Sequence, residues 1–307
     1  MRVLTFNLHS TYLYLLSHTG WDIENLIVPP TQPYNWHTQP YGYPTHSGAV
    51  HGSSEYGYKE WFPADWHDPP KVWLVPQVPN ITNVEAATGD YGLVIYIERV
   101  SRPWYTGEAR KKVMVNLVGD DYVAGGDITT VIHTPKASMF YIPMGVPDDF
   151  LSRAEHLVPE ALSSFACAKF RSHMLDLSIL SAINEVLPLH RHDMAEEEWS
   201  YDDLRAALSH HQMYVAAAWA VAGPVLATIE ALSSGIPTIL FDKLGQFTAF
   251  PDEAAKRVTA QHEAIDAAKW LLADANRAWE MGQRAREVAL KEFALESFIE
   301  GWLEVAK

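Results

Sequence analysis

The chain has 307 residues, 48% hydrophobic and 20% charged, which is a globular composition long enough for two domains and excludes disorder. Its formal net charge of −15 repels phosphate backbones and anionic membrane surfaces, so nucleic acid is disfavoured as the main partner. A single cysteine, Cys167, excludes an internal disulfide and fits a reducing compartment.

The first half of the chain alternates between β-rich and helical patterns. Residues 1–8 (MRVLTFNL) predict a strand, and residues 10–20 (STYLYLLSHTG) have apolar side chains at helical spacing. Residues 29–70 mix Pro, Gly, Tyr, Trp and His without a period, which predicts a long packed or functional loop region. Three further strands are predicted at 90–99, 111–120 and 129–133. Such strands between helices indicate an α/β fold with a parallel sheet.

Two prolines and a glycine in residues 140–150 (FYIPMGVPDDF) break any regular element, and we place the domain boundary there. In the second half, two strands are predicted at 163–170 and 213–219. Helices are predicted at 172–187, with apolar residues at 174, 177, 180 and 183, and at 200–211, capped by Ser200. Residues 188–199 are predicted as a loop, and long Ala-, Glu-, Lys- and Arg-rich helices close the chain.

The stretch AGPVLATIEALSSGIPTILFD, residues 222–242, predicts a helix at 225–233 followed by a short buried strand. Pro224 suits the first turn of this helix, and Gly235 suits its C-terminal cap. The helix N-terminus therefore follows the carboxyl end of a strand, where open α/β sheets bind ligands and free N–H groups attract an anion.

Two residues of this stretch suggest a ligand. Gly223 would let a phosphate approach the backbone closely. Glu230 lies about two turns into an otherwise apolar helix, where a carboxylate needs hydrogen-bond donors such as the two hydroxyls of a ribose. The alternative is that Glu230 is an ordinary solvent-exposed residue of a short helix.

The same stretch resembles the donor-site signature of GT-B glycosyltransferases, particularly family 4, in which a glycine-bearing loop leads into a helix with a glutamate, then G-x-P and a strand. IPMGVPDDF resembles the interdomain linker of that family, and SYDDLRAALSHHQMYVAAA resembles the helix and strand before the donor loop. MRVLTFNLHSTYLYLLSHTG resembles the first strand and helix of bacterial members. These pieces follow the family order and span nearly the full chain.

The resemblance implies the α/β fold called GT-B, in which two Rossmann-like domains with parallel sheets face each other across a cleft. Residues 1–147 would form the acceptor-side domain and 148–307 the nucleotide-sugar-binding domain. The last helix is a candidate to pack on the N-terminal domain. The implied activity is transfer of a sugar from a nucleotide-sugar to an acceptor, with retained anomeric configuration and with neither metal nor cofactor.

The resemblance also implies roles for single residues. Glu230 would hold the ribose hydroxyls, and Gly223 would lie beside the diphosphate and the sugar. Lys169 and Arg171 would neutralise the leaving diphosphate, which would be the main catalytic effect, although ordinary surface charge is the alternative for both. His9 would lie near the acceptor or the transferred sugar, or be structural. The remaining candidates are Trp219, Ala222, Pro224 and Val225 on the donor side and Ser10, Trp36 and His37 on the acceptor side.

The sequence departs from the family at Val221 and Ala222, where the family has an acidic residue that contacts sugar hydroxyls. That contact is made by another group, made by backbone alone, or lost. Trp219 is a candidate to shape the sugar pocket, and a core position is the alternative for it. A catalytically degenerate GT-B protein that binds a nucleotide or glycan without transferring it is therefore a second hypothesis.

Other hypotheses are weaker. A phage-type DNA base glycosyltransferase could use the aromatic loop at 29–70 to grip an unstacked base, against the acidic charge balance. The pairs His190 with His192 and His210 with His211 lack a further metal ligand at a recognisable spacing, and no GxSxG motif supports a serine hydrolase. With no signal-peptide pattern and no apolar run of membrane-spanning length, we expect a cytoplasmic protein. The acceptor class and the oligomeric state are left open.

Overall fold

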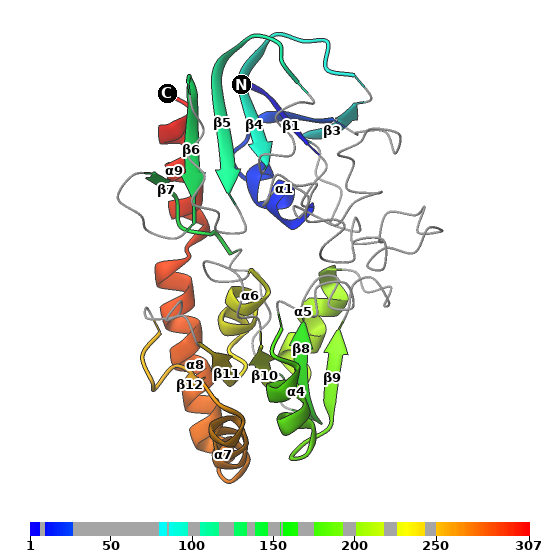
Figure 1. Cartoon of the computed structure of the whole chain (residues 1–307), viewed down its shortest axis with the longest axis vertical. Helices are drawn as coiled ribbons and strands as arrows, with labels where there is room; N and C mark the ends of the chain where they lie inside the picture. Colours follow the sequence, from blue (N-terminus) through cyan, green and yellow to red (C-terminus); the bar gives the residue numbers. More distant parts are fainter. Residues whose placement is uncertain are drawn as a thin grey trace, which may run out of the picture. The chain divides into compact units, whose positions relative to one another are not determined.

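The computed structural model describes residues 1–6, 10–26, 80–84, 86–97, 105–116, 126–133, 139–146, 154, 156–164, 175–192, 201–217, 226–242 and 250–307. The chain divides into two compact units, one made of Met1–Pro143 with Glu296–Lys307 and the other of Met144–Leu295. Each unit contains one parallel β-sheet with helices, so the predicted α/β class with parallel sheets is confirmed (Figure 1). The predicted loop region at 29–70 lies outside the described residues.

The sheet of the first unit has the strand order β3-β2-β1-β4-β5-β6-β7, and every neighbouring pair is parallel. The strands are β1 (Arg2–Phe6), β2 (Asp22–Leu26), β3 (Ile81–Val84), β4 (Tyr91–Ile97), β5 (Ala109–Asn116), β6 (Ile128–Ile132) and β7 (Phe140–Tyr141). The order reverses between β1 and β4, as in a Rossmann fold. Strand β4 is buried from Leu93 to Ile97 on both of its faces, because helices cover both sides of such a sheet.

The predicted strands at 1–8, 90–99, 111–120 and 129–133 and the helix α1 (Ser10–Ser17) are confirmed. The sequence analysis missed β2 because its DIENL pattern is rich in polar residues. Two of the strand's neighbours satisfy its central carboxylate: Arg2 Nε donates to Glu24 Oε1 at 2.7 Å, and the Tyr91 hydroxyl donates to Oε2 at 2.7 Å. The expectation of no regular element in 140–150 is wrong at its start, where β7 pairs with β6.

Helix α9 (Leu295–Val305) packs within the first unit through its aromatic residues. The Trp302 side chain is fully buried, and its ring lies edge-on to Tyr12 of α1 and to Trp21, with centroid distances of 6.4 and 6.2 Å. Next to it, the buried His133 uses Nδ1–H to donate to the Ile142 carbonyl at 2.7 Å, and Nε2 accepts from the Tyr12 hydroxyl at 2.9 Å. Helix α9 thus completes the hydrophobic core to which α1 and Trp21 contribute.

The sheet of the second unit has the order β12-β11-β10-β8-β9, again with all pairs parallel. Its strands are β8 (Val158–Ser164), β9 (Leu189–His192), β10 (His211–Ala216), β11 (Thr238–Phe241) and β12 (Lys256–Val258). The helices are α4 (Leu177–Asn184), α5 (Tyr201–His210), α6 (Leu226–Ser234), α7 (Gln261–Leu272) and α8 (Ala275–Glu292). Because β8 lies between β9 and β10, the strand order reverses at β8 and β10.

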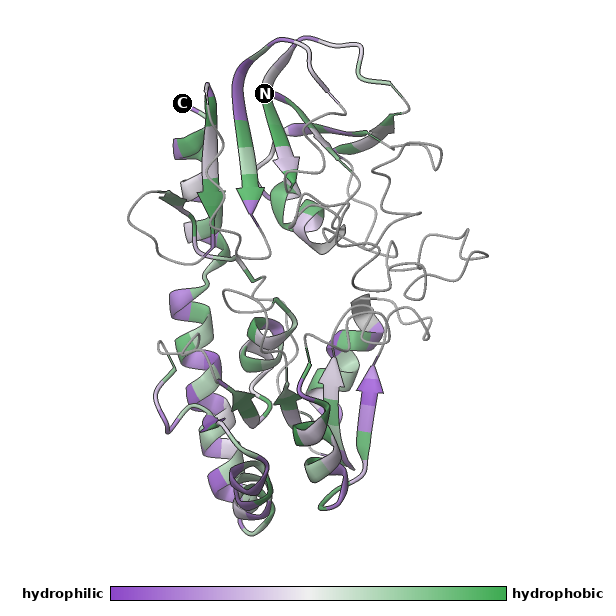
Figure 2. Cartoon of the chain, viewed as in Figure 1, coloured by the Kyte–Doolittle hydropathy of each residue, from purple (hydrophilic) through white to green (hydrophobic). Residues whose placement is uncertain are grey.

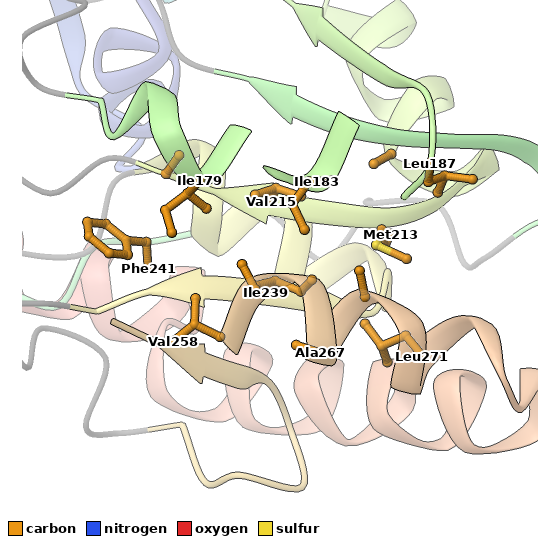
Figure 3. Close-up of a cluster of buried hydrophobic side chains, with 14 of the residues drawn as sticks. Ile179, Ile183, Leu187, Met213, Val215, Ile239, Phe241, Val258, Ala267 and Leu271 are labelled. Atoms are coloured by element: carbon orange, nitrogen blue, oxygen red, sulfur yellow. The ribbon is translucent and has the colours of Figure 1, made fainter. Parts of the chain in front are cut away.

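Helices α4 and α7 cover one face of this sheet. Ile179 and Ile183 of α4 meet Val215 of β10, and Ala267 and Leu271 of α7 belong to the same buried cluster (Figure 3). Strand β11, which lies between β10 and the edge strand β12, is mostly hydrophobic, whereas α8 mixes hydrophilic and hydrophobic residues (Figure 2). Helix α8 packs on α6 through its small buried residues, among them Gly282.

Several details of the second unit differ from the sequence predictions, and strand β12 was not predicted. Strand β8 begins five residues before the predicted strand at 163–170. Its start was missed because Pro159 and Glu160 are residues that strands rarely contain. Helix α4 begins only at Leu177, since the Asp176 side chain caps it by accepting from the Ser178 N–H at 3.0 Å. Leu177, expected on the apolar face, is exposed. The predicted loop at 188–199 contains the edge strand β9.

Candidate functional site

The helix predicted at 225–233 is α6, and the strand that follows it is β11. Ile229 and Leu232 are fully buried, as their spacing predicts. Gly235 ends the helix with φ +77°, a left-handed conformation that glycine adopts at no steric cost. The predicted helix, its glycine cap and the strand that follows are therefore confirmed, while Pro224 lies outside the described residues.

Glu230 is the charged residue of α6, and it is buried, with 4% of its surface exposed. Burial raises the pKa of its carboxyl from 4.5 to about 8. Among the described residues, no hydrogen bond or ion pair reaches this carboxylate. The reading of Glu230 as a solvent-exposed helix residue is therefore wrong, and a buried acid without a described partner is the unusual feature that needs an explanation.

Tyr214 of β10 lies beside Glu230 and is itself buried. Its hydroxyl donates to the carbonyl oxygen of Ser164, the last residue of β8, at 2.9 Å. Burial raises the pKa of Tyr214 well above its ordinary value, and the nearby Glu230 charge raises it further. The phenol is therefore a neutral hydrogen-bonding group that connects β10 to β8.

Two contacts with α8 set the position of α6. A Cβ built on Gly282 would overlap the carbonyl oxygen of Gly235, so the two backbones approach as closely as glycine permits. One turn further along α8, the Arg286 guanidinium donates to the carbonyl oxygen of Ser233 in the last turn of α6. The C-terminal half of the helix that carries Glu230 is thereby anchored.

The site lies where the strand order of the second sheet reverses. Strands β8 and β10 pair in parallel, so their carboxyl ends, Ser164 and Ala216, meet at one edge. Met213 and Val215 pack against α4 and α7, and Tyr214, between them on the same strand, therefore faces the other side of the sheet. Connections that leave for opposite faces open a crevice at such a switch point, which is where α/β sheets bind ligands.

Of the site residues predicted from sequence, Glu230 lies at this edge, and Ser10 is the first residue of α1 in the other unit. The remaining predicted residues lie outside the described residues: His9, Trp36, His37, Lys169, Arg171, Trp219, Ala222, Gly223, Pro224 and Val225. Tyr214 was missed. The signal that could have found it is strand alternation in MYVAAAW, which places Tyr214 on the face opposite Met213 and Val215.

The histidines considered as metal ligands do not form a metal site within the described ranges, where no group of three or more His, Cys, Asp or Glu side chains could hold an ion. His190 and His211 lie with ring centroids 5.9 Å apart, and His211 Nε2 is 4.0 Å from a Glu160 carboxylate oxygen. In the part of the chain that the structure describes, no helix is long and apolar enough to cross a membrane.

No family model matches the chain, and no curated protein matches it either. Solved structures do resemble it. They include sucrose-phosphate synthase from Thermosynechococcus elongatus, with a TM-score of 0.62 and 11% identity over 99% of this chain and 98% of that one. They also include Anabaena HepE in complex with UDP and glucose, with a TM-score of 0.57 and 8% identity over 99% of this chain and 98% of that one. A third is WaaG, a glycosyltransferase involved in lipopolysaccharide biosynthesis, with a TM-score of 0.55 and 10% identity over 100% of both chains.

These likenesses extend over both units and define the fold. The chain has the GT-B fold, with two Rossmann-like α/β units that each contain a parallel sheet. The neighbouring structures are GT-B glycosyltransferases. The predicted fold class is confirmed.

Proposed function

We propose that the protein is a family 4-like glycosyltransferase that transfers a sugar from a nucleotide-sugar to an acceptor. The observation that carries the proposal is the buried Glu230 carboxyl on α6, at the strand-order switch point of the second sheet. A buried acid without a described partner is costly unless a ligand supplies hydrogen-bond donors. A ribose diol supplies two.

In this proposal, the second unit binds the donor. The N-terminus of α6 faces the diphosphate, because free N–H groups at a helix start attract anions, and Gly223 allows the close approach. Lys169 and Arg171 stabilise the negative charge that develops on the diphosphate as its bond to the sugar breaks. The acceptor oxygen forms the new bond to the sugar, with retained configuration and without a metal ion.

Uridine nucleotides are the first to test for binding, and uridine nucleotide-sugars are the corresponding donors. The Anabaena neighbour was crystallised with UDP and glucose, and a carboxylate that clamps a ribose requires a ribonucleotide. We therefore expect UDP to bind better than dTDP, whose sugar lacks the 2′-hydroxyl. The acceptor in this proposal is a glycan or a small molecule.

The experiment is a thermal-shift titration of the purified protein with UDP, GDP, ADP, CMP and dTDP. A ligand that binds only the folded state raises the melting temperature, and the rise grows with the logarithm of the ligand concentration above its dissociation constant. We expect one ribonucleotide to stabilise the wild type, with the stabilisation lost in Glu230→Ala and kept in Glu280→Ala, an exposed position on α8. A folded wild type that responds to none of the nucleotides would overturn the proposal.

A catalytically degenerate binding protein is the second candidate, because Val221 and Ala222 replace the acidic residue of the family pattern. Nucleotide release from the matching nucleotide-sugar, followed with and without acceptors, separates the two. Slow hydrolysis or acceptor-dependent release supports the transferase. Binding without any turnover supports the degenerate scaffold.

A further inference from the structure

Arg286 of α8 is bonded to the end of α6, the helix that carries Glu230. Its guanidinium donates to the carbonyl oxygen of Ser233, in the last turn of α6. The last four carbonyl groups of a helix have no partner within the helix, so they need donors from outside it. A cation at the C-terminal end of a helix also interacts favourably with the helix dipole. Arg286 therefore ties α6 to α8 through a favourable contact.

This contact lies one turn from Glu230. Ser233 follows Glu230 by three residues, so the two occupy neighbouring positions on one side of α6. The Ser233 hydroxyl donates to the Ile229 carbonyl at 2.8 Å, which adds a bond to this turn of the helix. The Ser234 hydroxyl donates to the Ala231 carbonyl at 2.7 Å and adds another. Because the turn is bonded internally, a displacement of the Ser233 carbonyl moves the Glu230 backbone with it.

Arg286 adds a second fixed point between α6 and α8. The first is the close approach of the backbones, where a Cβ on Gly282 would overlap the Gly235 carbonyl oxygen. A single point of contact would let α6 tilt about it. Arg286 lies one turn along α8 from Gly282, and its acceptor lies on the Glu230 side of Gly235. The two contacts together fix the direction of α6.

We infer that Arg286 is a positioning residue of the candidate donor site: by holding the Ser233 carbonyl, it sets where the Glu230 carboxyl meets the ribose hydroxyls of a nucleotide, without touching the nucleotide itself. This inference rests on the proposed function and adds to it a residue on which the preference for ribose over deoxyribose depends. Hydrogen bonds weaken steeply with distance and angle, so a small displacement of the carboxyl reduces that preference.

The test compares Arg286→Met with a matched control, Arg277→Met. Both arginines belong to α8, and both guanidinium groups donate to a main-chain carbonyl in the last turn of another helix. The acceptor of Arg277 is Trp270 of α7, on the opposite side of the sheet from α6. Methionine keeps an unbranched side chain and removes the donors and the charge. We expect both variants to melt at a lower temperature, because each leaves a carbonyl without its donor.

The probes are UDP and 2′-deoxy-UDP, replaced by the corresponding pair if another ribonucleotide gives the thermal shift. We expect Arg286→Met to weaken UDP binding about fivefold and 2′-deoxy-UDP binding less than about twofold. Arg277→Met should leave the ratio of the two dissociation constants unchanged. Arg284→Met, which loses a surface ion pair to Glu287, controls for the lost charge on α8 and should also leave the ratio unchanged. Calorimetric titration at a temperature where every variant is folded measures both constants.

A variant that keeps the charge covers the case in which Arg286→Met does not fold. Arg286→Lys retains a cation, but an ammonium group does not reproduce the geometry of the guanidinium. It should therefore lower the ratio of the two dissociation constants by at least about twofold. An unchanged ratio in Arg286→Lys would then overturn the inference.

The outcomes separate the inference from the proposed function. A wild type that prefers UDP, with Arg286→Met keeping the full preference, overturns the positioning role alone. So does an equal fall of the ratio in Arg286→Met and Arg277→Met, because that pattern reports general destabilisation. A wild type that binds no ribonucleotide, or that binds the ribose and deoxyribose forms equally, overturns the ribose role of Glu230 and the inference together.

Discussion

Gly282 of α8 lies so close to Gly235 at the end of α6 that a Cβ on Gly282 would overlap the Gly235 carbonyl oxygen. We expect Gly282→Ala to lower the free energy of unfolding by about 1–3 kcal/mol, because the backbones must separate, despite the better helix propensity of alanine. Urea denaturation measures the change. The exposed control Glu280→Ala on the same helix should change the free energy of unfolding by less than about 0.5 kcal/mol. An unchanged stability of Gly282→Ala would contradict the prediction, because it would show that α8 can move away from α6 at no cost.

Burial raises the pKa of Glu230 from 4.5 to about 8, so the folded protein holds this proton more tightly than the unfolded chain. The contribution of the protonated Glu230 to the free energy of unfolding is fully present below pH 4.5, and it is lost as the pH rises through 8. Glu230→Gln should therefore match the wild type near pH 4 and exceed it above pH 8, by an amount on the order of a few kcal/mol. Unfolding free energies measured across this range test the prediction. A difference that is constant with pH would contradict it.

Tyr12 and His133 form a buried pair in the first unit, with the Tyr12 hydroxyl donating to Nε2 at 2.9 Å. Burial lowers the pKa of His133 to about 4, so the ring stays neutral and depends on this donor. Tyr12→Phe leaves a buried acceptor unsatisfied and should cost about 1–3 kcal/mol of unfolding free energy. Tyr105→Phe, which loses a solvent-accessible hydrogen bond to the Glu108 carbonyl, is the control and should cost much less.

Trp302 and Leu303 are adjacent on α9 but differ in burial, since Trp302 is fully buried and Leu303 is 41% exposed. Trp302→Ala removes the ring that packs on Tyr12 and Trp21 and should destabilise the protein by about 3–5 kcal/mol. Leu303→Ala should change the melting temperature little. Similar melting temperatures for the two variants would mean that α9 contributes no core to the first unit.

The sequence predicted elements well where the signals are local. Helix α6 and strand β11 lie within two residues of their predicted bounds, because the apolar spacing and the glycine cap at Gly235 depend only on residues close together in the sequence. Strands β2 and β9 were missed for the opposite reason. Their polar side chains suggest loops, and only pairing with β1 and β8 makes them strands. The sucrose-phosphate synthase likeness confirms the GT-B fold that the ordered motifs indicated.

The sequence by itself determined the α/β class, many of the strands and helices, and the position of one glutamate in a helix after a strand. It could not decide whether Glu230 faces solvent or the interior, because a helix of nine residues has room for both. That choice is made by the packing around α6, which includes the close approach of α8 at Gly282, far from Glu230 in the chain. Burial is a property of neighbours distant in sequence, and the raised pKa of Glu230 follows from burial alone.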